Sequence, residues 1–170
     1  MYCIKKATVS DVETIRQLAG EIWWDCYPAI LETEQITYML AEIYSAEKIT
    51  EQIWNGTQTY LLLVEDVQPV AFAAFSPREE NPDIYKLHKL YCLPGKQGKG
   101  YGKALLSAVI ENVKEAGKDI LELNVNKYNK AKAVYEKAGF KVIYEEDIPI
   151  GPYFMNDFVM RKSPLLNPPR

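Results

Sequence analysis

The sequence Gln97-Gly98-Lys99-Gly100-Tyr101-Gly102 contains three alternating glycines immediately before a predicted helix. Glycine at this spacing lets the backbone adopt positive φ and approach a ligand closely. The unpaired N–H groups of a first helical turn point outward and favour an anion. The lysines at 96, 99 and 103 add positive charge to the same segment. We therefore interpret residues 97–102, called here the glycine loop, as a binding site for a pyrophosphate.

Two common phosphate-binding motifs do not fit the glycine loop. A P-loop that ended in Gly102-Lys103 would need Ser or Thr at position 104, where the chain has Ala104. A dinucleotide-binding motif that began at Gly98 would need glycine at position 103, where the chain has Lys103. Neither nucleotide-binding class is therefore indicated by this segment.

The glycine loop does resemble a known signature, the Gln/Arg-x-x-Gly-x-Gly/Ala pattern of the GNAT (Gcn5-related) N-acetyltransferases. Gln97, Gly100 and Gly102 stand in its three signature positions. With a second block, described next, the resemblance extends over roughly residues 84 to 142. Among members of the family, the sequence is most similar to the bacterial polyamine-acetylating branch.

The second block follows a predicted strand at residues 120–125. It resembles the family's pattern of an Asn, a helix that carries Ala and Tyr, and a closing Gly-Phe pair. In this sequence the block reads Asn129, Tyr135 and Gly139-Phe140, with the Asn six residues before the Tyr. Both blocks occur in the order that the family requires, which makes the resemblance specific.

Apolar periodicity and turn residues predict the secondary structure along the whole chain. The strand–helix order after residue 84 also implies parallel pairing of neighbouring strands. The resemblance implies an α/β (α+β) GNAT fold, with a mixed, mostly antiparallel, twisted sheet of six to seven strands that contains one splayed parallel pair. Four to five helices are expected to flank this sheet. We predict one domain over residues 1–162 and a proline-rich tail at 163–170, helices at 12–24, 33–43, 45–54, 103–116 and 129–138, and strands at 4–7, 59–64, 69–75, 84–93, 120–125, 141–148 and 153–161.

Composition excludes several classes of function. The net charge is −3, from 20 basic and 23 acidic residues, which argues against a nucleic-acid partner because such proteins carry a strongly basic face. No apolar run approaches the roughly 20 residues of a membrane span, and the N-terminus lacks a signal-peptide core, so we expect a cytoplasmic protein without a membrane partner. The single histidine and the spacing of the three cysteines predict neither a metal site nor a disulfide.

Acetyl transfer to an amine needs both a base and an acid. A primary amine with a pKa near ~10.4 is almost entirely protonated at pH 7, so a proton must leave before attack, and the departing sulfur must be stabilised or protonated. The resemblance implies that Tyr135 is the acid; packing of its ring beside Gly139-Phe140 is the structural alternative. His88 stands where many members carry a glutamate base, and a half-buried strand histidine that hydrogen-bonds to its neighbours is the structural alternative.

The resemblance implies acetyl-CoA as the co-substrate. Backbone groups of Leu90, Tyr91 and Cys92 are expected to pair with its pantetheine amides as an added strand does. The N–H groups from Gly98 through Lys99, Gly100, Tyr101 and Gly102 to Lys103 are expected to bind its pyrophosphate, with Gln97 as the signature residue. Asn129 and Lys132 complete the expected cofactor contacts, although Lys132 is equally well explained as a solvated helix lysine.

The acceptor is expected to be a primary amine of a small molecule, polyamine-like or amino-acid-like, or of a peptide. The candidates for acceptor contacts are four aromatic residues, namely Trp24, Tyr27, Tyr38 and Tyr153. For the cluster around Trp24 and Tyr27, packing as a lid over the sheet is the structural alternative, and we expect at least one of its rings to contact the acceptor. Two other functions stay open on the sequence: an acyl-CoA-binding module without catalysis, and a protein N-terminal acetyltransferase. The sequence fits either a monomer or a homodimer.

Overall fold

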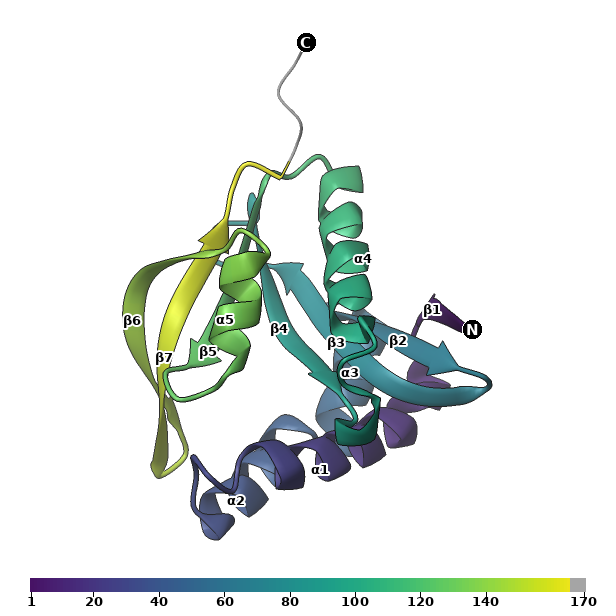
Figure 1. Ribbon diagram of the computed structural model, residues 1–170, viewed down its shortest axis with the longest axis vertical. Helices are drawn as coiled ribbons and strands as arrows, with labels where there is room; N and C mark the ends of the chain where they lie inside the picture. Colours follow the sequence, from purple (N-terminus) through teal and green to yellow (C-terminus); the bar gives the residue numbers. More distant parts are fainter. Residues whose placement is uncertain (166–170) are drawn as a thin grey trace. The chain divides into compact units, whose positions relative to one another are not determined.

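Seven strands, five α-helices and two 3₁₀ helices form over residues 1–165, the part of the chain that this computed structural model describes (Figure 1). The chain divides into two units. Unit 1 contains Met1–Ser76 and Lys89–Val109; unit 2 contains Pro77–His88 and the chain from Ile110 onward. The elements are β1 (Tyr2–Lys6), η1 (Val9–Asp11), α1 (Val12–Cys26), α2 (Thr33–Ile43), α3 (Ala46–Asn55), β2 (Thr59–Glu65), β3 (Gln68–Pro77), β4 (Ile84–Cys92), η2 (Pro94–Lys96), α4 (Tyr101–Glu115), β5 (Ile120–Asn126), α5 (Ala131–Lys137), β6 (Lys141–Ile150) and β7 (Tyr153–Lys162).

The sheet of unit 1 is antiparallel where β1, β2 and β3 meet. β1 lies at its edge and pairs with β2, which forms a hairpin with β3. The hairpin turn consists of Asp66 and Val67, which have φ of 46° and 68°. The paired stretches 59–64 and 69–75 that the apolar pattern predicted lie inside β2 and β3. A backbone bond from Leu93 N–H to the Val70 carbonyl, 2.9 Å long, joins the end of β4 to β3.

The three helices of unit 1 bury the apolar stripes that predicted them. The stripe of α1 is buried from Val12 to Ile22, and α1 contacts both α2 and α3 (Figure 1). Ser45 caps α3, because its hydroxyl oxygen accepts a 3.2 Å bond from the Lys48 N–H. Gly56 ends the same helix at φ 69°, which a side chain rarely adopts. The predicted start and stop of this helix are therefore confirmed.

The sheet of unit 2 is built on β5. Residues 84–87 of β4 pair in parallel with residues 120–123, and β7 pairs antiparallel with β5 on the other side. β6 pairs only with β7, as the outer strand of a hairpin. The expected parallel pairing of β5 with the strand that follows α5 is wrong, because the hairpin folds back and inserts β7 between them. α5 packs on β5.

The predicted fold class is confirmed. The strand order is β1-β2-β3-β4-β5-β7-β6, and β4–β5 is its parallel pair. At the end of the described chain, Leu165 is buried and its N–H donates to the Asp119 carbonyl at 3.0 Å. The rest of the predicted tail, residues 166–170, lies outside the described residues. The single-domain organisation stays a prediction.

Candidate active site

The glycine loop of unit 1 has the backbone that the sequence predicted. Gly98 and Gly100 adopt φ of 85° and 82°, and α4 begins directly afterwards at Tyr101. No acceptor within residues 1–165 receives the N–H groups of Gly98, Lys99 and Gly100. A Cβ built on any glycine of the loop would meet no atom within 4 Å, so the space beside the backbone is open. Unpaired donors, a helix N-terminus and open space fit a pyrophosphate.

Gln97 fixes the glycine loop to the end of β4. Its side-chain amide donates to the Cys92 carbonyl at 3.2 Å, and its N–H donates to the Pro94 carbonyl at 3.4 Å. The Cys92 carbonyl, which the sequence analysis expected to pair with pantetheine, therefore already has an internal donor. Leu90 and Tyr91, the other two residues of this expected contact, are half-buried. Burial raises the pKa of the Cys92 thiol, so this cysteine stays protonated at neutral pH.

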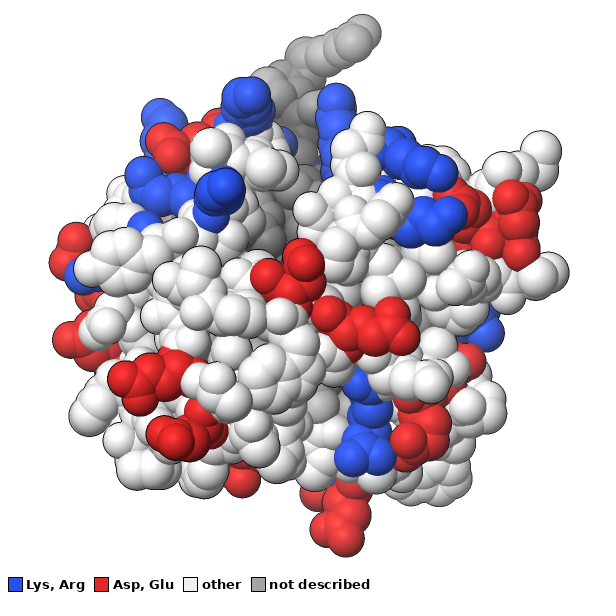
Figure 2. All heavy atoms as spheres, turned by 60° about the horizontal axis from the view of Figure 1, so that its bottom comes forward, with Lys and Arg blue, Asp and Glu red and all other residues white. Residues whose placement is uncertain are grey.

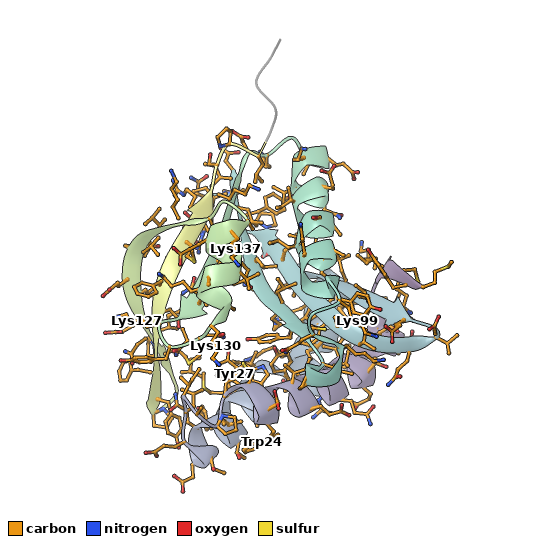
Figure 3. All side chains as sticks on the ribbon, in the orientation of Figure 1. Trp24, Tyr27, Lys99, Lys127, Lys130 and Lys137 are labelled. Atoms are coloured by element: carbon orange, nitrogen blue, oxygen red, sulfur yellow. The ribbon has the colours of Figure 1, made fainter. Side chains whose placement is uncertain are left out.

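Glu65, at the end of β2, binds several cations and donors of the glycine loop. Its carboxylate accepts from Lys96 Nζ at 2.6 Å, from Lys99 Nζ at 3.4 Å and from the Tyr101 hydroxyl. These bonds, led by that of Lys96, lower the pKa of Glu65 to about 2, and the carboxylate raises the pKa of Tyr101 to about 12. Figure 3 labels Lys99 on this segment. Lys103 is exposed and has no ion pair among residues 1–165, so its charge remains available to an anion.

Aromatic residues of unit 1 form a cluster that joins α1 to β4. Tyr27 is buried, packs on Trp23 with ring centroids 4.5 Å apart, and shares a 3.1 Å hydroxyl–hydroxyl bond with Tyr91. Trp24 is 43% exposed (Figure 3), and Tyr38 is half-buried on α2. Residues 28–34, which include most of the α1–α2 connection and the first two residues of α2, line an open hollow of about 500 Å³. Of the aromatic residues predicted to contact the acceptor in this unit, Trp24 offers the most accessible ring.

Lys89 of β4 is a buried cation that the sequence analysis did not select. Its ammonium donates to the Tyr60 hydroxyl at 2.7 Å and to Gln58 Oε1 at 3.1 Å. It also lies 5.5 Å from the centroid of the Tyr44 ring and 4.9 Å from that of Tyr60, within cation–π range. The signal was present in the alternation of β4, which places Lys89 on the apolar face with Leu87. A lysine on such a face predicts buried aromatic and hydroxyl partners.

Tyr135 of unit 2 is the predicted acid. It lies on α5, is only 8% exposed, and packs edge-on against Phe140 with centroids 5.8 Å apart. Its carbonyl accepts the Phe140 N–H at 3.0 Å, so the Gly-Phe pair and the tyrosine form one packed unit. The Tyr135 ring therefore does pack against Phe140, as the structural alternative to a catalytic role predicted. The catalytic role concerns the hydroxyl and stays a prediction.

Asn129 and Lys132 organise α5. Asn129 Oδ1 accepts the Ala131 N–H at 2.9 Å and so holds the first residue of this helix, although the residue directly before the helix is Lys130. Lys132 Nζ pairs with Glu136 at 3.1 Å and lies 5.1 Å from the centroid of the Phe158 ring. Its charge is thus partly neutralised within the helix, as expected for a solvated lysine.

Two other lysines near α5, Lys130 and Lys137, carry charges that are less neutralised than that of Lys132. Figure 3 labels Lys127, Lys130 and Lys137 along the β5–α5 connection and α5, and Figure 2 shows blue side chains gathered over this part of unit 2. Lys127 pairs with Glu145 at 3.0 Å. Lys130 and Lys137 are exposed and form no ion pair among the described residues. They are the better candidates for an outer phosphate contact than Lys132.

His88 ends the part of β4 that belongs to unit 2. It follows directly after Leu87, the last residue paired with β5, and is half-buried. Alternation along the strand places it on the same face as Lys86. Tyr153, the remaining predicted acceptor contact, is half-buried at the start of β7. The geometry of His88 suits either of its two interpretations.

Two properties of the described chain bear on the wider predictions. Within residues 1–165, no group of three or more His, Cys, Asp and Glu side chains is placed to hold a metal ion. None of the helices in that range combines the length and apolar character needed to cross a membrane.

Comparison with known proteins agrees with this geometry. The family model described as an acetyltransferase (GNAT) domain matches residues 29–151, which is more than half of the chain. The chain belongs to the GNAT acetyltransferase family. It is 30% identical over 136 residues to an uncharacterised N-acetyltransferase of Mycobacterium bovis, a match that covers 79% of this chain and 85% of the relative.

Two further comparisons involve Thermoplasma acidophilum. A spermidine N(1)-acetyltransferase of this organism is 29% identical over 162 residues, covering 94% of this GNAT chain and 96% of the relative. The crystal structure of a PaiA N-acetyltransferase from the same organism, in complex with coenzyme A, superposes with a TM-score of 0.83 and 28% identity, covering 96% and 99% of the two chains. The chain is therefore an enzyme of the N-acetyltransferase class.

Proposed function

We propose that this GNAT enzyme transfers the acetyl group of acetyl-CoA directly to a primary amine of a small molecule, polyamine-like or amino-acid-like. The observation that carries the proposal is the glycine loop, where three consecutive N–H groups have no acceptor within residues 1–165 and precede a helix N-terminus. A pyrophosphate satisfies such donors. The relative named for spermidine and the structure that contains coenzyme A support the acceptor class and the co-substrate.

Each unit contributes its own part of the binding chemistry. In unit 1, Gly98, Lys99 and Gly100 donate N–H bonds to the pyrophosphate, and Lys103 adds a positive charge that has no ion pair within residues 1–165. Leu90 and Tyr91 supply backbone groups for the pantetheine amides. In unit 2, Lys130 or Lys137 binds an outer phosphate more readily than Lys132, since Lys132 already pairs with Glu136.

Proton transfers are assigned to two side chains of unit 2. Acetyl-CoA supplies the acetyl group as a thioester, so a carbon–nitrogen bond forms while the carbon–sulfur bond breaks. His88 accepts the proton that the acceptor ammonium must lose, because a neutral imidazole is basic near pH 7. Tyr135 donates a proton to the departing thiolate, since a phenol with a pKa near ~10 keeps its proton at neutral pH. The nitrogen loses its second proton to the resulting phenolate as the amide forms, which restores the phenol.

The substitution Tyr135→Phe tests the assignment of the acid. It keeps the ring that packs on Phe140 and removes only the hydroxyl, so we expect kcat to fall by about 10²–10⁴-fold with near-normal acetyl-CoA affinity. Steady-state kinetics and calorimetric titration with acetyl-CoA measure the two effects. Tyr128→Phe is the matched control, because that tyrosine is 74% exposed in the same segment. Unchanged turnover in Tyr135→Phe contradicts the assignment.

The remaining alternatives are separated by the acceptor. A chain that binds acetyl-CoA but releases no coenzyme A with a broad panel of amines is the acyl-CoA-binding module without catalysis. Turnover with peptides and not with small amines identifies a protein N-terminal acetyltransferase. For the base, loss of the acidic limb of the rate–pH profile in His88→Ala supports His88, and retention of that limb excludes it. The cytoplasmic location and the monomeric or homodimeric state remain predictions.

A further inference from the structure

Two buried carboxylates on the sheet of unit 2, those of Glu122 and Asp157, differ in their ion pairs. Glu122 of β5 is 3% exposed, and both of its oxygens are satisfied: Arg78 Nε donates to Oε1 at 2.7 Å and Arg161 Nε donates to Oε2 at 2.7 Å. Asp157 of β7 is 5% exposed, yet no arginine or lysine pairs with it among residues 1–165. Charged side chains are rarely buried without such a partner.

Asp157 and Asn124 each have a buried oxygen that receives no hydrogen bond from residues 1–165. Asn124 Nδ2 donates to Asp157 Oδ2 at 3.4 Å and to Glu146 Oε2 at 3.2 Å. The second oxygen of the aspartate, Oδ1, and the amide oxygen of Asn124 are both inaccessible to solvent and receive no hydrogen bond within the described chain. Buried polar atoms are normally satisfied, so these two call for an additional donor.

The orientation of the Asn124 amide is fixed by its neighbours. Both of its N–H groups point at carboxylates, which only accept hydrogen bonds. Turning the amide over would place its oxygen against Asp157 and Glu146 and would leave the nitrogen unpaired instead. The Asn124 amide oxygen is therefore the atom left without a donor from the part of the chain that the structure describes.

One cation, Lys86, interacts with Asp157 through its charge. Lys86 of β4 interacts electrostatically with Asp157 and Glu146, but no ion pair joins them in the described chain. Burial lowers the pKa of Lys86 and raises that of Asp157. Glu146 and Asp147 of β6 add negative charge on the other side of Asp157. Negative charge therefore exceeds positive charge around Asp157 Oδ1 and Asn124 Oδ1.

We propose that Asp157 Oδ1 and Asn124 Oδ1, with the Glu146 carboxylate beside them, bind an ammonium group of the acceptor. This inference rests on the proposed function and names its substrate class, an alkyl diamine or polyamine. The nitrogen held here is not the one that is acetylated, because nearby carboxylates favour the protonated form of an amine and attack requires the neutral form. The acceptor must therefore carry at least two amines.

The register of unit 2 places this site on the face that carries His88. Lys86 pairs with Glu122 in the parallel register, so His88 falls two residues further along β4, at the level of Asn124 on β5. Residues 86 and 88, like residues 122 and 124, share one face by alternation. The proposed ammonium site thus lies on the same side of the sheet as the proposed base.

A matched pair of ligands tests the site by binding. 1,4-Diaminobutane and n-butylamine differ only in the second amine, and calorimetric titration of each into the enzyme, saturated with coenzyme A, measures affinity without turnover. We expect the diamine to bind wild type at least tenfold more tightly than the monoamine, and Asp157→Asn to lose this difference. Glu145→Gln is the control, since it removes one charge from the adjacent residue of β6, whose carboxylate pairs with Lys127 at 3.0 Å. Equal diamine affinity in wild type and Asp157→Asn overturns the proposal.

Thermal unfolding separates a binding role from a structural one. Asp157→Asn keeps the shape and removes a buried charge, so the ligand-free variant should melt at or above the wild-type temperature while losing the shift that the diamine produces. A lower melting temperature together with an intact diamine shift overturns the proposal. Glu146→Gln, at an exposed position, supplies a second variant and should weaken diamine binding less than Asp157→Asn.

Kinetics distinguish failure of this site from failure of the proposed function. If Asp157-dependent diamine binding occurs but no amine is acetylated, the ammonium site stands and the proposed function fails. If amines are acetylated and Asp157→Asn leaves the KM for 1,4-diaminobutane unchanged, the function stands and the ammonium site fails. We expect Asp157→Asn to raise that KM at least tenfold, whereas the control Glu145→Gln should change it less than twofold.

Discussion

Glu65 is the residue on which the charge balance of the glycine loop depends. Its pKa in the folded chain is lowered to about 2 from an ordinary value of 4.5, chiefly by Lys96. A carboxyl with a lowered pKa stabilises the fold fully above its unfolded pKa, and this contribution is lost as pH falls from about 4.5 toward 2. We therefore expect the melting temperature of wild type to fall more steeply across that range than that of Glu65→Gln.

The control for Glu65→Gln is Glu79→Gln, which removes the same charge from an exposed side chain without an ion pair in the described chain. Thermal unfolding at a series of pH values measures both variants. Parallel profiles for wild type and Glu65→Gln contradict the assigned role. At neutral pH the variant also releases Lys96 and Lys99, so we expect its affinity for coenzyme A to rise.

At the scale of single residues, what the sequence could predict depended on how local the requirement is. Gly98 and Gly100 were predictable because the need for positive φ is set by a few neighbouring residues. Glu65 was not, since its partner Lys96 is 31 residues away and no local pattern links them. Asp157 and Asn124 were missed for the same reason, because their strands meet only in the folded sheet.

At the scale of elements, we expect two glycines at the start of α4 to be needed for different reasons. Gly100 is needed for its backbone conformation, and Gly102 for close approach of a ligand. Gly100 needs positive φ, so Gly100→Ala should destabilise the fold by about 1–2 kcal/mol. Gly102 lies within α4 and is not at positive φ, so Gly102→Ala should stabilise by up to about 1 kcal/mol. Urea unfolding measures both changes.

Binding of coenzyme A gives the complementary result for the same pair of variants. A Cβ at either position points into open space in the chain alone, so a loss of affinity reflects the ligand itself. We expect both alanine variants to bind coenzyme A at least tenfold more weakly, although only Gly100→Ala is destabilised. Wild-type affinity in Gly102→Ala shows that no phosphate approaches that position closely.

The strand order in the sheet was predictable where strands that follow one another in the sequence pair directly. It was not predictable for the last hairpin, because either of its strands could pair with β5. The β2–β3 hairpin followed from a short turn between two apolar runs, and the β4–β5 pair followed from the helix between them. β6 and β7 form a long hairpin of which either strand could lie beside β5. The burial pattern decides: β7 carries Met155, Val159 and Met160 into the core, whereas β6 is exposed almost throughout.

At the scale of the whole molecule, two independent units would unfold in separate transitions, whereas the predicted single domain would unfold in one. β4 and α4 each contribute residues to both units. A strand and a helix that continue from one unit into the other couple their folding, so we expect one cooperative transition. The chain offers a direct probe, because its three tryptophans, Trp23, Trp24 and Trp54, all belong to unit 1, while β5, α5, β6 and β7 belong to unit 2.

Urea unfolding followed by tryptophan fluorescence therefore reports unit 1, and hydrogen exchange of the β5 and β7 amides reports unit 2. Coincident midpoints establish a single domain, and separate midpoints contradict it. Coenzyme A at 100 times its Kd should add about 2.7 kcal/mol to the stability of whatever unfolds with its binding site. If the chain is one domain, both probes must shift together, by the same free energy, even though the glycine loop belongs to unit 1 alone.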